Sequence, residues 1–179
     1  MEQRKMMDYQ GLGDRVRYPF VIFDWGDTLM KDDPQAKTPM VQWPVVEAVD
    51  GAEEVLSVIH AQRTVILATN AVQSDEADIR RALQRVNLDD YVDHIFCFRN
   101  TGLRKPSADF FQHISHSLKA PASDMVMVGD SFETDIQGAN LAGVMGVWLN
   151  RHDTEVRVGE QHTTIHHLRE LPHFLAQVA

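Results

Sequence analysis

The sequence predicts an α/β fold in which helices cover both faces of a parallel sheet. Two observations carry this prediction. Five short apolar runs recur along the chain, and most of them are continuously apolar rather than alternating, which is typical of strands buried on both faces. The segments between the runs have helical periodicity, and strands that alternate with helices form a three-layer sandwich. The runs cover residues 20–23, 64–68, 94–98, 125–128 and 144–149.

The segments between the runs carry signals for where helices begin. Asp50 and Glu53 stand three residues apart, which is the spacing of a capping box, so a helix is expected to start at Asp50. Ser74 and Ser107 each precede a segment with an apolar face, and they are expected to be the N-caps of two further helices.

The last third of the chain is expected to hold two more helices. A short helix over 135–142 precedes Gly143, a residue suited to the left-handed position after a helix C-terminus. The final helix is expected over 164–177, interrupted or restarted at Pro172, because proline has no backbone N–H to donate.

Composition and charge limit the class of protein. With 179 residues, 44% of them hydrophobic and 24% charged, the chain is predicted to be one globular domain over 18–179, preceded by a polar N-terminal extension over 1–17. The formal net charge of −9 disfavours affinity for nucleic-acid backbones and anionic membrane surfaces, since both would repel it. Homo-oligomerisation stays open.

Cysteine content and hydropathy indicate a compartment. Cys97 is the single cysteine, so no internal disulfide can form, and a reducing compartment is expected. No apolar stretch approaches the ~20 residues that span a bilayer. Residues 1–17 also lack the apolar core of a secretion signal. We therefore expect a cytoplasmic protein without a membrane partner.

Polar residues that follow the apolar runs are the first candidates for a functional site. In parallel α/β sheets, ligands bind beyond the carboxyl ends of the strands, where the strand order reverses. Each such residue alone is weak evidence, because a carboxylate after a strand is commonly a helix cap or a turn residue. The candidates are Asp24, Asp27, Thr69, Asn70, Lys105, Asp130 and Asp135.

Four segments that contain these residues together resemble the signature motifs of the haloacid dehalogenase superfamily. In chain order they are VIFDWGDTL at 21–29, ILATN at 66–70, LRKPSADFF at 103–111 and VMVGDSFETDIQGANLAG at 126–143. The resemblance runs from about Phe20 to Asn150, and the fourth segment is its most specific part. It implies a Rossmann-like sandwich with a five-stranded parallel sheet in the order 5-4-1-2-3.

The resemblance also implies Mg²⁺-dependent hydrolysis of a phosphate monoester through an aspartyl-phosphate, with Asp24 as the nucleophile. Mg²⁺ would be bound by Asp24, Asp130 and the backbone carbonyl of Gly26. Electrostatics supports this chemistry independently, because the ester and a carboxylate nucleophile are both anionic, and the site must concentrate positive charge. Oxygen atoms are the ligands that Mg²⁺ prefers.

The other matched residues are implied to act on the phosphate group. Thr69 and the backbone N–H of Asn70 would hold non-bridging oxygens, and Lys105 would neutralise the negative charge of nucleophile and phosphate. Asp135 would act indirectly, by fixing Lys105 or a metal-bound water. The implied partner is a phosphorylated substrate of unknown size.

No substantial cap domain is expected over this site. Residues 31–43, which we call the flap, are long enough only for a short cover. The helix expected from Asp50 belongs to the core fold itself. The site is therefore predicted to be open to large substrates or to a neighbouring subunit.

The first motif departs from the family two residues after the nucleophile. Phosphatases of the superfamily usually carry an aspartate there, which protonates the leaving oxygen and later activates water. This chain has Gly26, and Asp27 follows it. Asp27 rearranges to serve as acid and base, or Gly26 admits water or a substrate group, or phosphatase activity is weak or absent. The last reading makes the chain a binding or regulatory protein. Phosphoryl transfer to an acceptor other than water is a further alternative.

Overall fold

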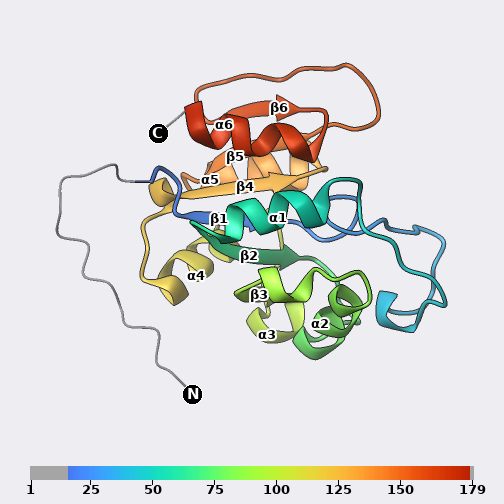
Figure 1. Cartoon of the computed structure of the whole chain (residues 1–179). Helices are drawn as coiled ribbons and strands as arrows, with labels where there is room; N and C mark the ends of the chain where they lie inside the picture. The colour runs from blue at the N-terminus through green and yellow to red at the C-terminus, as the bar shows by residue number, and fades with distance from the viewer. Residues whose placement is uncertain (1–15, 178–179) are drawn as a thin grey trace.

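The computed structural model describes residues 16–177 and is built on one parallel sheet (Figure 1). The strand order is β3-β2-β1-β4-β5-β6. The first five strands and their order agree with the prediction from the sequence. The strands are β1 (Phe20–Phe23), β2 (Thr64–Thr69), β3 (His94–Cys97), β4 (Met125–Gly129), β5 (Met145–Leu149) and β6 (His162–Ile165).

The sheet has six strands rather than five. β6 pairs with β5 in parallel, over part of a segment for which the sequence predicts a helix from residue 164. It escaped prediction because His162, Thr163 and Thr164 are only half-buried, so no apolar run marks this edge strand. Thr164 Oγ1 contacts the backbone N and O of Arg157, both at 2.8 Å, which covers the sheet edge with the preceding loop.

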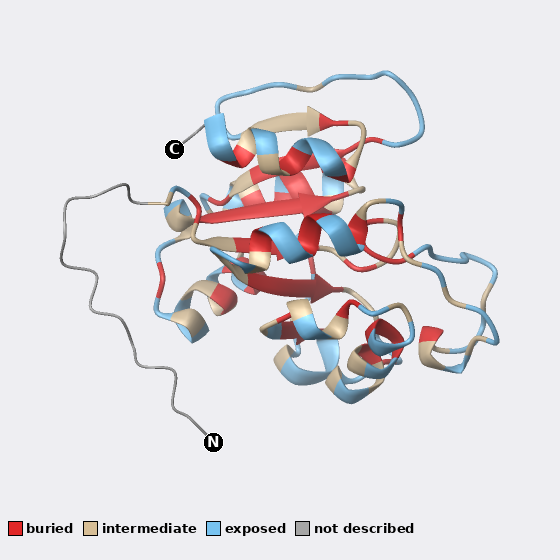
Figure 2. Cartoon of the chain, in the orientation of Figure 1, coloured by how far each residue is buried: buried red, intermediate tan, exposed pale blue. Residues whose placement is uncertain are grey.

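Helices cover both faces of the sheet, as predicted. Residues of α1, α2 and α6 pack on one face with Val21, Phe23 and their strand neighbours. Residues of α4 and α5 pack on the other face with Ile22 and its neighbours. Figure 2 shows the central strands buried between these layers. The helices are α1 (Ala52–His60), α2 (Glu76–Gln84), α3 (Phe98–Thr101), α4 (Ala108–Leu118), α5 (Gly138–Leu141) and α6 (Leu171–Gln177).

Two of the three predicted helix starts are wrong by one or two residues. Gly51 is the N-cap of α1, and the carboxylate of Asp50 binds Arg169 and His167 instead of closing a capping box. Asp75, not Ser74, caps α2, because Asp78 at the third helical position completes its capping box. Ser107 caps α4 as predicted.

The last third of the chain follows the predicted order with shifted bounds. The helix expected over 135–142 begins earlier, as a π-helical segment η4 (Phe132–Gln137) that continues into α5. Gly143 takes the expected left-handed conformation, with φ of 79°. Pro172 is the second residue of α6, where its missing N–H removes no helical hydrogen bond.

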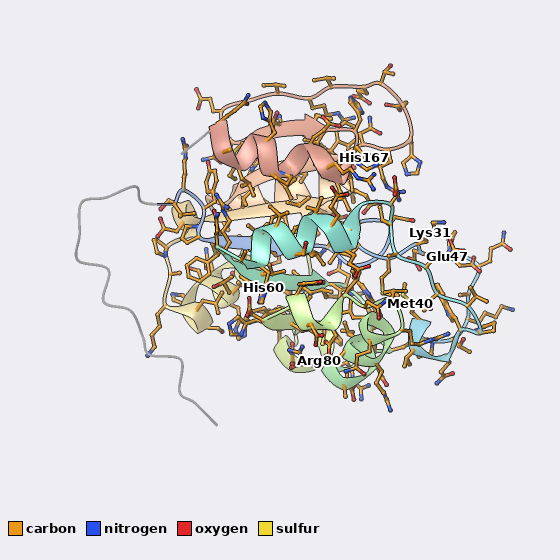
Figure 3. The ribbon with its side chains drawn as sticks, in the orientation of Figure 1. Lys31, Met40, Glu47, His60, Arg80 and His167 are labelled. Carbon is orange, nitrogen blue, oxygen red and sulfur yellow. The ribbon has the colours of Figure 1, made fainter. Side chains whose placement is uncertain are left out.

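The flap lies beyond the carboxyl end of β1 and contains one short 3₁₀ turn, η1 (Met40–Gln42) (Figure 1). Lys31 and Glu47 form an ion pair at its base, and Figure 3 shows them side by side. Met40 is 5% exposed, and Arg85, the C-cap residue of α2, donates to the carbonyl oxygens of Val41 in the flap and of Pro44 just after it. The flap is therefore fixed to the domain at both ends.

Between β1 and β2, the structure places only the flap, its continuation into α1 and α1 itself. α1 packs on the sheet, so the absence of a substantial cap agrees with the prediction. Within residues 16–177, no helix is long and apolar enough to cross a bilayer. The predicted extension over 1–17 lies outside the described residues except for its last two.

Candidate active site

Three central strands bring the predicted site residues together. Asp24 follows β1, Thr69 ends β2, and Asp130 follows β4. Because β1 lies between β2 and β4 in the sheet, the carboxyl ends of these strands converge. This is the point where the strand order reverses, and where ligands bind in open parallel sheets.

The ammonium group of Lys105 lies at the centre of the cluster. Its Nζ donates to Asp24 Oδ1 at 2.6 Å, to Asp135 Oδ1 at 2.7 Å and to the Ala68 carbonyl oxygen at 2.8 Å. An ammonium has three N–H donors, so all of them are used. The Lys105 side chain is 1% exposed, which makes this a buried and fully hydrogen-bonded cation.

Charge keeps Lys105 protonated despite its burial. Burial on its own lowers the pKa of Lys105, but the Asp24 and Asp135 carboxylates outweigh it, so the pKa is raised. Burial has the opposite effect on the carboxyl group of Asp135, whose pKa it raises, and the positive charge of Lys105 opposes that rise. Both Asp135 oxygens accept hydrogen bonds, from Lys105 and from the Ser131 N–H at 3.1 Å. This arrangement indicates an ionised carboxylate that forms an ion pair with the lysine.

A glycine at the end of β4 makes room for Asp135. A Cβ on Gly129 would lie 2.2 Å from Asp135 Oδ2 and 2.4 Å from its Cγ. Such separations are far below van der Waals contact, so any larger residue would displace the carboxylate. Gly129 thus allows Asp135 to reach Lys105.

Asn70 holds the Lys105 loop through its side chain. Its amide donates to the Lys105 carbonyl oxygen and accepts the Lys105 N–H, both at 2.9 Å. The sequence assigns the backbone N–H of Asn70 to a phosphate oxygen, a role that its side-chain contacts leave open. Thr69 is 5% exposed, and its hydroxyl accepts the Ala71 N–H at 3.1 Å, so its proton remains available for donation.

Asp130 lies on the other side of Asp24. Its backbone N–H donates to Thr28 Oγ1 at 3.1 Å, and the Thr28 hydroxyl lies 3.4 Å from Asp24 Oδ2 and 3.5 Å from Asp130 Oδ1. Trp148 Nε1 donates to the Asp130 carbonyl at 2.8 Å. Burial raises the pKa of Asp130 to about 6, and the Asp24 and Asp27 carboxylates add to the rise.

The donor set fits a divalent cation. Carboxylate oxygens of Asp24, Asp130 and Asp135 lie within 4.8 Å of one another. Both oxygens of Asp135 are already engaged, so Asp24 and Asp130 are the carboxylates left to bind a metal. Burial is the main cause of the raised pKa of Asp130, and the nearby Asp24 and Asp27 carboxylates add to it. A cation bound between Asp24 and Asp130 would favour the ionised form of both carboxylates.

Asp27, the residue after Gly26, lines the pocket, and its side chain contacts the flap and Arg151. Asp27 has a left-handed backbone, with φ of 54°. Its Oδ1 accepts the Asp32 N–H at 3.2 Å, and Arg151 Nη2 lies 3.5 Å from the same oxygen and 2.7 Å from the Asp27 carbonyl oxygen. Asp27 thus joins the flap to the loop after β5.

Asp32, which the sequence did not indicate, lies against Gly26. Partial burial raises the pKa of Asp32; the Asp33 N–H opposes this rise, and the Asp27 and Asp24 carboxylates add to it. The candidates predicted from the sequence also did not include Thr28 and Arg151. Thr28 belongs to the first motif, so its place near Asp24 could have been predicted. Asp32 and Arg151 lie in loops whose paths the sequence does not fix.

The predicted site residues and Asp32 line one open pocket of about 590 Å³. Asp24, Thr69, Lys105 and Asp130 form its floor, and the flap forms a wall that includes Asp32, Lys37 and Trp43. A pocket of this size suits a small-molecule group. Both Asp24 and Asp135 line the pocket, but the side chain of Asp24 is 14% exposed, against 2% for Asp135, so Asp24 is the more accessible carboxylate.

Removal of the buried cation tests the cluster. Lys105→Met leaves two carboxylates without their partner, so we expect the free energy of unfolding to fall by about 3–5 kcal/mol. Asp135→Asn in the Lys105→Met background removes one of these charges and should restore part of the loss. Urea denaturation of the single and double variants measures both effects.

Lys37→Met is the matched control, because Lys37 is exposed and surface substitutions usually stay within about 0.5 kcal/mol. Equal unfolding midpoints for Lys105→Met and the wild type would contradict the described cluster.

Comparison with known proteins identifies the family. A family model for haloacid dehalogenase-like hydrolases matches residues 40–143. The putative HAD-hydrolase YfnB of Bacillus subtilis is 30% identical over 132 residues, which cover 72% of this chain and 54% of YfnB. The pyrimidine 5′-nucleotidase YjjG of Escherichia coli is 32% identical over 129 residues, which cover 71% of this chain and 56% of YjjG. The chain thus spans about half the length of these relatives, and further relatives are phosphatases.

A solved structure agrees over nearly the whole fold. The structure of an uncharacterised protein from Listeria monocytogenes has a TM-score of 0.78 and 27% sequence identity, and covers 89% of this chain and 97% of the Listeria chain. The four motif segments, the sheet order and the family model therefore agree. The chain belongs to the haloacid dehalogenase superfamily of hydrolases.

Proposed function

We propose that the chain is a Mg²⁺-dependent phosphatase that hydrolyses phosphate monoesters through an aspartyl-phosphate on Asp24. One observation carries this proposal: Lys105 binds two carboxylates at the floor of the pocket, and Asp24 is the more exposed of the two, with 14% of its side chain accessible against 2% for Asp135. A fixed carboxylate beside a fixed cation is suited to attack an anionic ester.

The two carboxylate oxygens of Asp24 have different contacts. Oδ1 accepts the Lys105 ammonium at 2.6 Å, while Oδ2 lies 3.4 Å from the Thr28 hydroxyl. The short bond to Lys105 fixes the orientation of the carboxylate. Attack by a carboxylate oxygen on phosphorus would split hydrolysis into two easier steps, with a covalent intermediate between them.

The end of β2 supplies groups for the phosphate. The Thr69 hydroxyl keeps its proton for a non-bridging oxygen, and the Asn70 backbone N–H stands next to it in sequence. Lys105 supplies positive charge at the same place. Asp135 acts on the substrate only through Lys105, which it keeps charged and in position.

Asp24, Asp130 and the Gly26 carbonyl would hold Mg²⁺. When bound, Mg²⁺ would neutralise charge on the phosphate oxygens in the transition state. Thr28 and Trp148 fix the backbone of Asp130, so the metal-binding carboxylate rests on a buried frame. The net charge of −9 is compatible with an anionic substrate, because a bound cation reverses the local field.

The relatives support a phosphate ester as substrate. Two are named as pyrimidine 5′-nucleotidases and others as phosphatases, which makes nucleoside monophosphates and sugar phosphates the first esters to assay. The alternative of an inactive binding domain rests on Gly26 alone. Transfer to an acceptor other than water is disfavoured by the open pocket, which excludes water poorly.

Replacement of the nucleophile tests the proposal. Wild-type protein with Mg²⁺ should release phosphate from at least one ester of a panel that contains p-nitrophenyl phosphate and uridine 5′-monophosphate. Asp24→Asn should lower kcat by about 10⁴-fold or more, as the loss of a member of a nucleophilic constellation does. Phosphate release is the measurement. Undiminished release from Asp24→Asn, or none from the folded wild type with Mg²⁺, would contradict the proposal.

Mg²⁺ binding can be measured through protein stability, without an activity assay. Mg²⁺ at about 100 times its Kd should add about 2.7 kcal/mol to the free energy of unfolding of the wild type. Asp130→Asn should lose most of this gain, because it removes a metal ligand. Its midpoint without Mg²⁺ should equal or exceed that of the wild type, because the substitution also removes a buried negative charge. Denaturation with and without Mg²⁺ measures both.

Asp90→Asn is the matched control, since Asp90 is an exposed carboxylate in η2 (Asp89–Tyr91) and should respond to Mg²⁺ as the wild type does. An equal gain for Asp130→Asn and the wild type would place the metal elsewhere.

A further inference from the structure

The space beside Gly26 is filled by a carboxylate from another part of the chain. A Cβ on Gly26 would lie 3.0 Å from Asp32 Oδ2 and 3.2 Å from Asp32 Cβ and Cγ. A side chain at position 26 would therefore compete with the Asp32 carboxylate for the same space. We propose that Asp32, carried by the flap, is the acid and base of this site and performs the proton transfers for which Gly26 has no side chain.

Local hydrogen bonds aim the Asp32 carboxylate. The Asp32 N–H donates to Asp27 Oδ1 at 3.2 Å, and Asp32 Oδ1 accepts the Asp33 N–H at 2.9 Å. Oδ2 is the oxygen that lies nearest to Gly26. Asp32, Asp24 and Gly26 line the same pocket, so this oxygen borders the space where a substrate bound to Asp24 would lie.

Asp27 is the positioning residue in this arrangement. Its Oδ1 is engaged by the Asp32 N–H and lies near Arg151, and Arg151 also binds its carbonyl oxygen. These contacts hold the start of the flap rather than a substrate atom. The one-residue displacement of the aspartate from position 26 to position 27 therefore supports the flap that carries Asp32.

The flap that carries Asp32 is anchored to the rest of the domain by several contacts. Lys31, its neighbour in sequence, donates its backbone N–H to the Glu47 carbonyl at 2.9 Å and forms an ion pair with the Glu47 side chain. Trp43 Nε1 donates to the Thr38 carbonyl at 2.8 Å, and Met40 is buried. Because these contacts fix the flap in the free protein, less conformational entropy is lost in positioning Asp32 when a substrate binds.

The proposed steps balance. An Asp24 oxygen bonds to phosphorus as the ester P–O bond breaks, and the proton of the Asp32 carboxyl passes to the leaving oxygen, which departs as an alcohol. Then the Asp32 carboxylate takes a proton from water as the water oxygen bonds to phosphorus. The P–O bond to Asp24 breaks, phosphate leaves, and Asp24 ionised and Asp32 protonated are restored.

This inference rests on the proposed phosphatase function, and the nature of the leaving group separates the two. An alkoxide needs a proton to leave, whereas p-nitrophenolate does not. Asp32→Asn should therefore lower kcat/KM for uridine 5′-monophosphate by about 10²–10⁴-fold and for p-nitrophenyl phosphate by less than about 10-fold. With p-nitrophenyl phosphate it should also give a burst of one nitrophenolate per protein molecule, because the second step lacks its base.

Two further variants serve as a rescue and as a control. Gly26→Asp in an Asp32→Gly background, which leaves that space empty, places a carboxylate where Asp32 was and should restore at least tenfold of the kcat/KM that Asp32→Gly loses. Asp90→Asn should behave as the wild type with both esters. Retention of the Mg²⁺-induced gain in stability by Asp32→Asn would establish that the variant is folded.

The outcomes are distinguishable. A loss of kcat/KM that is at least tenfold greater for uridine 5′-monophosphate than for p-nitrophenyl phosphate, with rescue by Gly26→Asp, supports the inference. Equal activity of Asp32→Asn and the wild type with both esters overturns it and leaves the proposed function intact. Equal loss with both esters also overturns it, because Asp32 would then act on something other than the leaving group. Inactive wild type with both esters overturns the proposed function and this inference with it.

Discussion

The candidate site depends on one buried ammonium group. Lys105 has no exposed N–H, and its three acceptors come from the ends of β1 and β2 and from η4. A buried cation is costly unless it is both paired and hydrogen-bonded, and the cluster meets both conditions. A buried ion pair contributes little net stability compared with an apolar pair. What it contributes here is a fixed orientation of Asp24.

Two features of the sequence around Lys105 follow from that constraint. Gly129 is small because Asp135 must approach Lys105 past the end of β4. Asn70 binds both backbone groups of Lys105 and so fixes the loop that carries it. Each of these residues acts on Asp24 indirectly, through the position of Lys105 or of Asp135. Substitutions at Gly129 and Asn70 are therefore expected to act on chemistry through the position of a charge.

The central strands and the placement of the residues that follow them were predictable from the sequence pattern, whereas the strand order was implied by the resemblance to the superfamily. Continuous apolar runs identify buried parallel strands, and the residues after them must meet at one edge of the sheet. The edge strand β6 was not predictable in this way, because half-buried threonines produce no apolar run. Asp50 failed as a cap because Arg169 and His167, more than a hundred residues away in sequence, bind its carboxylate.

The departure at Gly26 shows where sequence reasoning stops. Comparison with the family pattern identifies a missing carboxylate and points to Asp27 as the nearest candidate. Only the path of the flap shows that Asp27 turns toward Arg151 and that Asp32 lies against Gly26. That path depends on long-range contacts such as those of Arg85 with the flap and its continuation, which no local pattern reports.

The most direct test of the account is the chemical identity of the intermediate. Wild-type protein would be mixed with p-nitrophenyl phosphate and Mg²⁺, quenched before steady state, and treated with borohydride, which reduces an acyl phosphate to an alcohol. Peptide mass spectrometry would then locate the change. The account predicts homoserine at position 24, absent when substrate or Mg²⁺ is omitted. Phosphate release with an unmodified Asp24, or with reduction at another carboxylate, would contradict it.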